Sequence, residues 1–569
     1  MEGVVEEQQQ AHAMEKKAGL RLIPVIIANE VSERIVSASV GANLIIYLTT
    51  KYHLGAASSA IIIFVYLAAA NFLPVCGAIV SDALLGRYLM VTLTLFSCTI
   101  GTTLLCLTSV IPSLTPLDCN LPNQGGCASS TPVQIFVLCA SLGFMALGAS
   151  GVRPCCLAFA EDQIAHWDEA RKDRALRALF SWYYVSVGFS QIVAITVLVY
   201  LQDKMGWKVG FMVSAAIMAS VTLVNLAVSP FYVKVKPQKS MWAGLVKVVV
   251  VAVNNRHLEL PGANHGVQFH SLPGSTQLVP SEKMRFLNKA CIVRSRAGSN
   301  ADEEESVIKS TCTVEQVENL KSALSVMPMW SAMVMSFLLQ SSSFGVLQAA
   351  TMDRRIGTTR FQIPAGSISI FDTMTFTVWS GCYDSHILPL LRRVMGRQRV
   401  LTLKQRMGIG LFLAVASTAV ASAVEARRRG VAARMSALWL APQYVLMGLS
   451  GAFGAIAQIE FYYAVLPKSM GSFVLALLYF GAGVANIGGT VIVKLVNVVT
   501  GRGGADPWIS DDLDRGRYDL YYLLLAVLGA VDFVYFVACA YLFHETTQNT
   551  SLEAAVADGE AEEMVELRG

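Results

Sequence analysis

Long apolar segments constrain this chain more than any other feature. A helix of about 20 mostly apolar residues is long enough to cross the hydrocarbon core of a bilayer. Twelve such segments lie at 21–49, 57–80, 88–112, 133–159, 180–201, 209–233, 323–348, 365–383, 406–424, 437–463, 469–496 and 519–543. Only 15% of the residues are charged, whereas soluble domains carry about 25%. The sequence therefore predicts an all-α membrane protein with twelve transmembrane helices.

One polar insert separates these segments into six and six, which predicts two six-helix bundles. We expect a cytoplasmic tail at 1–20, a bundle at 21–234, a cytoplasmic linker at 235–322, a second bundle at 323–545 and a cytoplasmic tail at 546–569. An apolar stretch in the linker, from Met241 to Val253, is too short to span a bilayer. We expect it to form a helix along the membrane surface.

The loops between spans predict the orientation. Lys and Arg of the first half fall mostly on the side of the N-terminal tail, and an excess of these residues marks the cytoplasmic side. With twelve spans, both termini are then cytoplasmic. Arg427, Arg428, Arg429 and Arg434 do not fit, because they fall on the predicted outer side. A predicted outer loop also holds Cys119 and Cys127, which we expect to form a disulfide, with two free thiols as the alternative.

Three ionisable residues lie inside the first span. Glu30, Glu33 and Arg34 are three and four positions apart, so they share one face of a helix. Charges inside a membrane are costly and usually functional. Arg34 can pair with Glu30, which leaves Glu33 as a carboxylate able to take a proton. We interpret the three as a proton-coupling site, and the alternative is a static ion cluster that holds helices together.

A second set of charges joins the two halves in the predicted fold. Arg153 in the fourth span and Glu460 in the tenth lie at similar depth, in equivalent helices of the two bundles. Repeated halves place such positions on opposite sides of a central cavity. We therefore predict a salt bridge between them that also contacts substrate; each residue could instead pair within its own half. The polar residues predicted to line the same cavity are Gln340, Tyr183, Tyr184 and Gln458.

A similar motif follows the second span of each half. Asp82 precedes a Gly-Arg pair that ends at Arg87, and Asp384 precedes one that ends at Arg397. An acid can cap a helix while the Arg pairs across the turn, forming a cytoplasmic clasp that opens as the halves move. Ordinary helix capping is the alternative. No metal-ligand or phosphate-loop motif occurs, so the sequence predicts neither a metal nor another cofactor, and no enzyme activity.

Several of these motifs resemble a known family. Glu30-x-x-Glu33-Arg34 resembles the ExxER motif of the proton-coupled oligopeptide transporters, a branch of the major facilitator superfamily. The segments SGVRPC, RFLNKACI, TVEQVENLKSALSVMPMW and AIAQIEFYYAVLPKSM resemble its plant branch, the nitrate/peptide transporter family. The resemblance covers nearly the whole chain. It implies an alternating-access fold and a proton-driven symporter of nitrate, peptides, hormones or glycosides.

The expected function is proton-coupled symport of a small anion, with nitrate as the leading substrate. Three acids, Glu30, Glu33 and Glu460, face two bases, Arg34 and Arg153, so two protons create a site that one monovalent anion neutralises. The alternatives are an organic substrate (a hormone, a glycoside or a short peptide) or a membrane sensor that transports nothing. The expected partners are protons, the substrate and the bilayer, without nucleic acid. We expect a monomer or weak dimer in the plasma membrane or the tonoplast.

Overall fold

The computed structural model describes residues 22–543 with internal gaps. The gaps are 117–128, 165–166, 168, 236–240, 258–268, 271–279, 282, 293–310, 342–343, 356–360, 384–388, 390–392, 394–400, 432–433, 468–469 and 503–505. Within the described residues the fold is helical, and β-structure is limited to isolated bridges such as Phe269 with Ile292. The predicted all-α class is confirmed.

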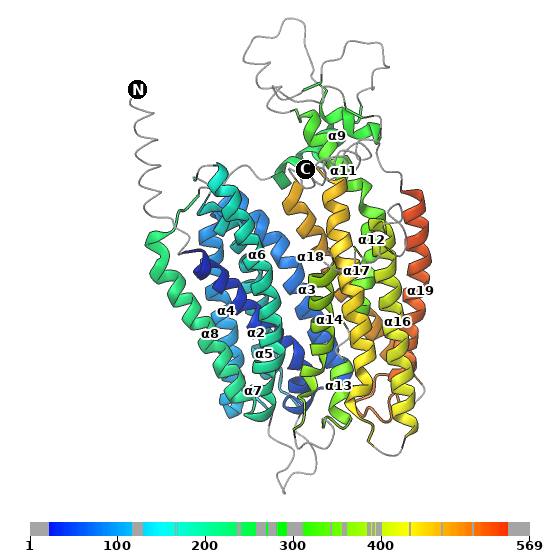
Figure 1. The fold of residues 1–569 in the computed structure, drawn as a ribbon. Helices are drawn as coiled ribbons and strands as arrows, with labels where there is room; N and C mark the ends of the chain where they lie inside the picture. The colour runs from blue at the N-terminus through cyan, green and yellow to red at the C-terminus, as the bar shows by residue number, and fades with distance from the viewer. Residues whose placement is uncertain are drawn as a thin grey trace, which may run out of the picture. The chain divides into compact units, whose positions relative to one another are not determined.

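The first half contains six long helical spans (Figure 1). Their elements are α2 (Ile23–Thr50), α3 (Ala56–Val80) with the π-turn η1 (Ser81–Leu85), α4 (Arg87–Val110), α5 (Pro132–Asp162), α6 (Glu169–Val193) continued by η3 (Ala194–Leu198) and α7 (Val199–Lys204), and α8 (Trp207–Val228).

The second half has five further long spans among the described residues, which makes eleven in all. Its elements are α12 (Met327–Gln340) with α13 (Phe344–Thr351), η6 (Ala365–Ser369) with α14 (Ile370–Cys382), α16 (Leu403–Gly430), α17 (Ala441–Val465), α18 (Gly471–Thr500) and α19 (Tyr518–Leu542). The segment predicted at 365–383 is not among the five, since its described part consists of η6 and the 13-residue α14 and the described residues break off after Tyr383.

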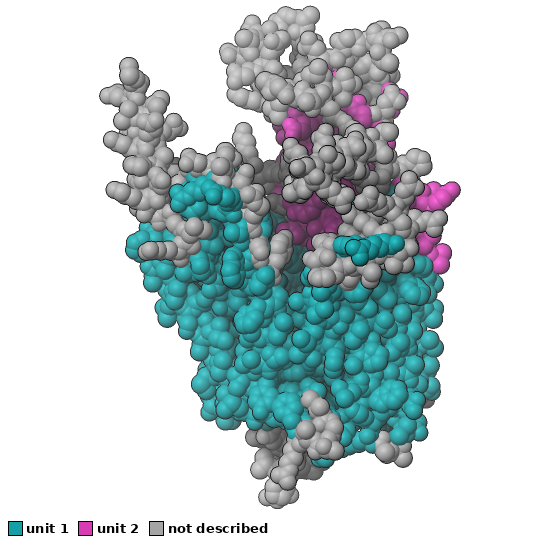
Figure 2. All heavy atoms as spheres, in the orientation of Figure 1, with its two compact units in different colours: residues 1–238, 333–456, 478–533 teal, residues 239–332, 457–477, 534–569 magenta. Residues whose placement is uncertain are grey.

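The chain divides into two compact units, coloured separately in Figure 2. Unit 1 comprises residues 1–238, 333–456 and 478–533; unit 2 comprises 239–332, 457–477 and 534–569. Unit 1 therefore contains the first bundle and most of the second. Unit 2 contains the described linker elements, α9 (Met241–Asn254), η5 (Arg285–Ala290) and α11 (Val314–Ser325). The short helix predicted in the linker is α9, and its contact with a membrane surface stays a prediction.

The linker elements of unit 2 are tied by buried polar contacts. Lys321 of α11 donates to the Ser281 carbonyl at 2.8 Å and pairs with Glu318 at 2.7 Å. Cys291 follows η5 and is fully buried. Burial raises the pKa of the Cys291 thiol to about 12, so the thiolate is rare at neutral pH.

Close helix packing in unit 1 fixes α5 against its neighbours. Gly148 and Gly151 lie where α5 meets α4, and a Cβ added to either would collide with Cys98 or Thr94. Small residues at such contacts let helix backbones approach closely in membranes. The position of Arg153, two residues further along α5, is therefore set by backbone packing as well as by its charge.

Polar side chains anchor α2 in the same bundle. The Asn29 amide donates to Asn225 of α8 at 3.1 Å, and Asn225 donates to Thr92 of α4 at 3.2 Å. All three side chains are buried. An unpaired amide in an apolar interior is costly, so these bonds fix the rotation of α2 and with it the face that carries Glu30.

Within unit 1, the two halves of the chain meet at the end where α2 turns into α3. Ser367 of η6 donates to the Ile195 carbonyl of η3 at 2.6 Å, and Arg354 lies 3.6 Å from Asp203. The Asp511 carboxylate, in the loop before α19, accepts from the Ala56 amide at 2.9 Å. It thereby caps α3, whose own N-cap residue Gly55 offers no side chain.

Two of the four arginines that do not fit the charge rule, Arg428 and Arg429, pair with acids. Arg428 makes two hydrogen bonds to Glu425, both 2.9 Å long, and one to Asp514 at 2.7 Å. Glu425 is fully buried and also accepts from Gln348 at 2.8 Å. Arg429 pairs with Asp519 at 3.0 Å. These two arginines at the end of α16 are therefore held by acids of the same bundle, and the predicted orientation stays a prediction.

We expect Glu425→Ala to destabilise the protein. The change leaves Arg428 without its buried partner, and breaking a buried ion pair costs about 3–5 kcal/mol. The melting temperature of purified protein in detergent should fall clearly below that of the wild type. Arg515→Ala is the control, because Arg515 and Asp512 are exposed and 3.7 Å apart, and such pairs contribute roughly 0–1 kcal/mol. Equal melting temperatures for the two variants would contradict the assignment.

Candidate functional site

Helix α2 places three charges in the interior of unit 1. Glu30 and Glu33 are 1% and 0% exposed, and the Arg34 side chain is 19% exposed. Their shared face was predicted from the spacing, and the contacts below show that they belong to one connected cluster. Such charges persist in a low-dielectric interior only where partners neutralise them.

Glu33 is held on both oxygens. Arg153 of α5 donates from Nε to Oε2 at 3.0 Å and from an Nη atom to Oε1 at 2.9 Å, a two-point contact. Ser37, one turn along α2, donates to Oε1 at 2.6 Å. Two-point guanidinium contacts are among the stronger hydrogen-bonded pairs in proteins. Glu33 is thus a fully satisfied carboxylate that joins α2 to α5.

Glu30 is satisfied on one side only. Its Oε1 accepts from Arg34 at 2.8 Å and from the Tyr183 hydroxyl of α6 at 2.6 Å. Its Oε2 is buried and has no hydrogen-bond partner among the described residues. A proton added at Oε2 displaces no existing hydrogen bond. Glu30 is therefore the carboxyl of this cluster with an open position for a proton.

This geometry changes the roles expected from the sequence. Glu33 was the predicted titratable neighbour, but Arg153 already occupies both of its oxygens. The predicted pairing of Arg34 with Glu30 is present, with a shortest N–O distance of 2.6 Å. The cluster therefore holds two acids and two bases and carries no net charge when all are ionised.

Arg153 pairs within its own half of the chain, which was the alternative to its pairing with Glu460. Glu460 and Gln458 belong to unit 2, where Gln458 donates to Tyr462 at 2.7 Å and Glu460 is exposed. The salt bridge between Arg153 and Glu460 stays a prediction. Of the other predicted lining residues, Gln340 donates to Ser336 at 3.1 Å, and the Tyr184 side chain lies outside the described part.

The first predicted clasp has a partner that the sequence did not indicate. Arg87 pairs with Asp162 at the end of α5 at 2.5 Å and donates to the Ala158 carbonyl at 3.1 Å. Asp82 lies in the π-turn η1 before it. Asp384, Arg397, Cys119 and Cys127 lie outside the described residues. The second clasp and the disulfide therefore stay predictions.

An apolar groove lies between α2, the helix that carries the charged cluster, and α6. It has a volume of about 610 Å³ and lies between the first turns of α2, including Ile27 and Val31, and the middle of α6, including Leu179 and Trp182. Arg34 lies three residues after Val31, so it continues the same face of α2. The groove can hold an apolar group. Among the described residues, no group of His, Cys, Asp and Glu is arranged to hold a metal ion.

The sequence missed several residues that build this site. Asn29 and Asn225 hold α2, and Ser37 supports Glu33. Asn29 and Asn225 could have been noticed as amides inside apolar spans, which need internal partners. The spacing along one helix cannot show that Ser37 or Tyr183 contacts the acids, because those contacts depend on rotamers and on packing between helices.

A multi-span helical fold with a buried cluster of acids and bases is typical of membrane transporters. A family model described as the POT family matches residues 88–509. Two Arabidopsis thaliana proteins are similar along nearly their whole length. NRT1/ PTR FAMILY 1.2 is 36% identical, and the match covers 97% of this chain and 94% of the relative. NRT1/ PTR FAMILY 1.1 is 38% identical, and the match covers 95% of this chain and 94% of the relative. The chain belongs to the POT family and is a proton-coupled transporter of its NRT1/PTR branch.

Solved structures confirm the fold. An auto-inhibited POT family peptide transporter has a TM-score of 0.68 at 18% identity, covering 93% of this chain and 98% of that one. A POT family transporter in complex with 5-aminolevulinic acid has a TM-score of 0.61 at 15% identity, covering 92% and 97%. At these identities the similarity concerns the fold, which is that of the major facilitator transporters. The predicted family and fold class are thus confirmed.

The two acids of α2 should differ in their effect on stability. Glu33→Gln leaves Arg153 without a full countercharge, and we expect a loss of about 3–5 kcal/mol. Glu30→Gln keeps an oxygen for Arg34 and Tyr183 and places its amide where Oε2 has no partner, so we expect a smaller loss. Melting temperatures in detergent measure the difference. A larger loss for Glu30→Gln would contradict the assigned roles.

Proposed function

We propose that this protein is a proton-coupled symporter of a small monovalent anion, with nitrate as the leading substrate. One observation carries the proposal: each acid of the buried cluster is matched by a guanidinium, and Glu30 has an open oxygen. Protonation of Glu30 removes one negative charge and leaves Arg34 in excess. The cluster then attracts one monovalent anion, and binding restores neutrality.

The Arg34 side chain is suited to this role because it is partly exposed, whereas both acids are buried. A proton on Glu30 weakens the ion pair, so the guanidinium can turn toward an anion in the cavity. The loaded site is neutral and crosses the low-dielectric barrier at lower cost than a charged one. Coupling follows, since the anion binds weakly without the proton and the proton binds weakly without the anion.

We expect two protons per anion, as the acids counted in the sequence indicate, so that one positive charge enters with each nitrate. A membrane potential of 100 mV then adds about 2.3 kcal/mol of driving force. We propose the plasma membrane, or alternatively the tonoplast, with both termini in the cytoplasm and a monomer or weak dimer as the transporting form.

An organic anion with an apolar body is the second candidate. The groove between α2 and α6 favours it, because its lining is mostly apolar and Arg34 follows one turn after Val31 on α2. An apolar group in the groove and a carboxylate at Arg34 would use both features. Nitrate needs only the guanidinium and gains nothing from the groove.

We expect nitrate to evoke inward current at negative potentials and acid pH in oocytes that express the protein, measured under voltage clamp. Glu30→Gln should weaken the dependence of this current on external pH, because residue 30 can no longer gain or lose a proton. Surface labelling provides the control for expression. An undiminished pH dependence in Glu30→Gln would remove Glu30 from the coupling.

The same assay separates the two substrates. Ala28→Leu adds bulk to the groove lining and should leave nitrate current unchanged while weakening transport of an aromatic carboxylate. Current with the carboxylate, and none with nitrate, would replace the first candidate by the second. If neither evokes current and both are taken up without proton dependence, coupling through Glu30 is wrong.

A further inference from the structure

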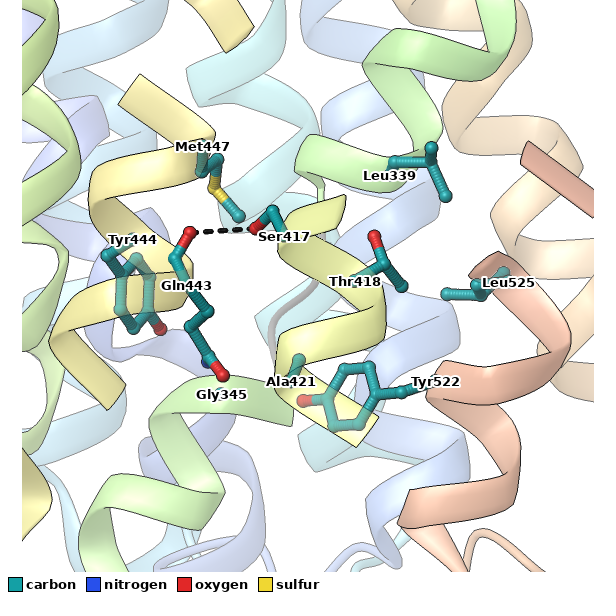
Figure 3. Close-up of a pocket in the computed structure, with 10 residues that line it drawn as sticks. All are labelled: Leu339, Gly345, Ser417, Thr418, Ala421, Gln443, Tyr444, Met447, Tyr522 and Leu525. Atoms are coloured by element: carbon teal, nitrogen blue, oxygen red, sulfur yellow. Dashed lines mark hydrogen bonds between the residues drawn. The ribbon is translucent and has the colours of Figure 1, made fainter. Parts of the chain in front are cut away.

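A small cavity lies where α12, α13, α16, α17 and α19 meet in unit 1 (Figure 3). Its volume is about 20 Å³. A space of about 10–15 Å³ of this kind is enough to admit one water molecule. The cavity therefore has room for one water but not for a larger solute. It shares no lining residue with the charged cluster of α2 or with the groove beside α6.

Gln443 is the residue that gives this cavity a polar wall. It is the third residue of α17, and only 5% of it is exposed. Its backbone carbonyl accepts from the Ser417 hydroxyl at 2.7 Å, the dashed line in Figure 3. Its side-chain Oε1 is buried and has no hydrogen-bond partner among the described residues. Because an amide oxygen without a donor is costly in an apolar interior, Oε1 needs a donor from within the cavity.

The hydroxyl groups around the cavity direct their protons elsewhere. Ser417 donates to the Gln443 carbonyl, and Thr418 donates to the Ala414 carbonyl of its own helix at 2.9 Å. The Tyr444 hydroxyl is directed to Gly345, where an added Cβ would lie 2.5 Å away. The donor for Gln443 is therefore a molecule that enters the cavity.

The arrangement of polar groups suits a water molecule. Figure 3 shows the Tyr522 hydroxyl pointing toward the Gln443 amide, with Ala421 between them. A water between these groups can donate to Gln443 Oε1 and to the Thr418 oxygen, which keeps lone pairs after donating its own proton. A phenol hydroxyl can donate to the same water. Three hydrogen bonds are typical of a buried water.

The charge of the lining favours water over a cation. None of the ten residues that line the cavity is charged. Glu425 lies one turn after Ala421 on α16, but its oxygens already accept from Arg428 and Gln348. Burying a monovalent cation without a countercharge is costly, whereas a neutral water needs only hydrogen bonds.

We propose that this cavity is a binding site for one ordered water, held by Gln443 Oε1 and by the hydroxyl groups of Thr418 and Tyr522. The water joins α16, α17 and α19 by hydrogen bonds and lets α17 carry a buried amide in its first turn. This site goes beyond the proposed function and is independent of the substrate and of the coupled protons.

A high-resolution cryo-EM map of the full-length protein tests the site directly. We expect one peak of density in the cavity, about 2.5–3.0 Å from Gln443 Oε1, as in a hydrogen bond from a water. The same peak should be missing in Gln443→Leu. A map that resolves other buried waters but shows no density here would overturn the proposal.

A pair of variants tests the water by the sign of an effect on stability. Ala421→Val adds two methyl groups to the cavity lining and should expel the water, so Gln443 Oε1 loses its donor. We expect the melting temperature in detergent to fall by a few degrees. In the Gln443→Leu background the acceptor is gone, so adding Ala421→Val should leave the melting temperature unchanged or raise it.

The other outcomes of these measurements contradict the proposal. A higher melting temperature for Ala421→Val in the wild-type background would show that the cavity is dry, since the change would fill an empty space. An equal loss in both backgrounds would show crowding rather than a lost hydrogen bond. Replacing sodium by choline in the buffer should have no effect on the wild type. Stabilisation by sodium that disappears in Gln443→Leu would show a cation in place of the water.

Discussion

The buried pairing of carboxylates with guanidinium groups is the interaction on which the first bundle depends. Neither Glu30 nor Glu33 could remain ionised in this buried, low-dielectric interior without Arg34 and Arg153. The Glu33 pair joins α2 to α5, and the Tyr183 hydrogen bond joins α2 to α6. Three helices are thus held by electrostatic contacts that also form the proposed coupling site, so the proposal links stability and function through the same atoms.

This arrangement separates a permanent pair from an adjustable one. Arg153 contacts both oxygens of Glu33, and close packing of α5 on α4 fixes its backbone. Arg34 instead approaches one oxygen of Glu30 from the same helix and keeps part of its surface exposed. A proton at Glu30 can therefore change the charge available to substrate while the contact between α2 and α5 stays intact.

The sequence predicted the helical class from apolar length and the shared face of Glu30, Glu33 and Arg34 from their spacing along one helix. The family followed from the resemblance of several sequence motifs. It could not predict that Glu33 pairs with Arg153, since that contact joins helices 120 residues apart. Asp162 was missed for the same reason, as Arg87 reaches it across the bundle. The charge count along the loops likewise could not show that Arg428 pairs with the buried Glu425.

The hydrogen bond from Ala56 to Asp511 has a consequence for how the chain is made. Helix α3 begins after Gly55, so its own sequence provides no side-chain acceptor for its first amides. The acceptor lies 455 residues later in the chain. The first bundle can therefore complete this helix end only after the loop before α19 has been synthesised, which makes the order of synthesis part of its assembly.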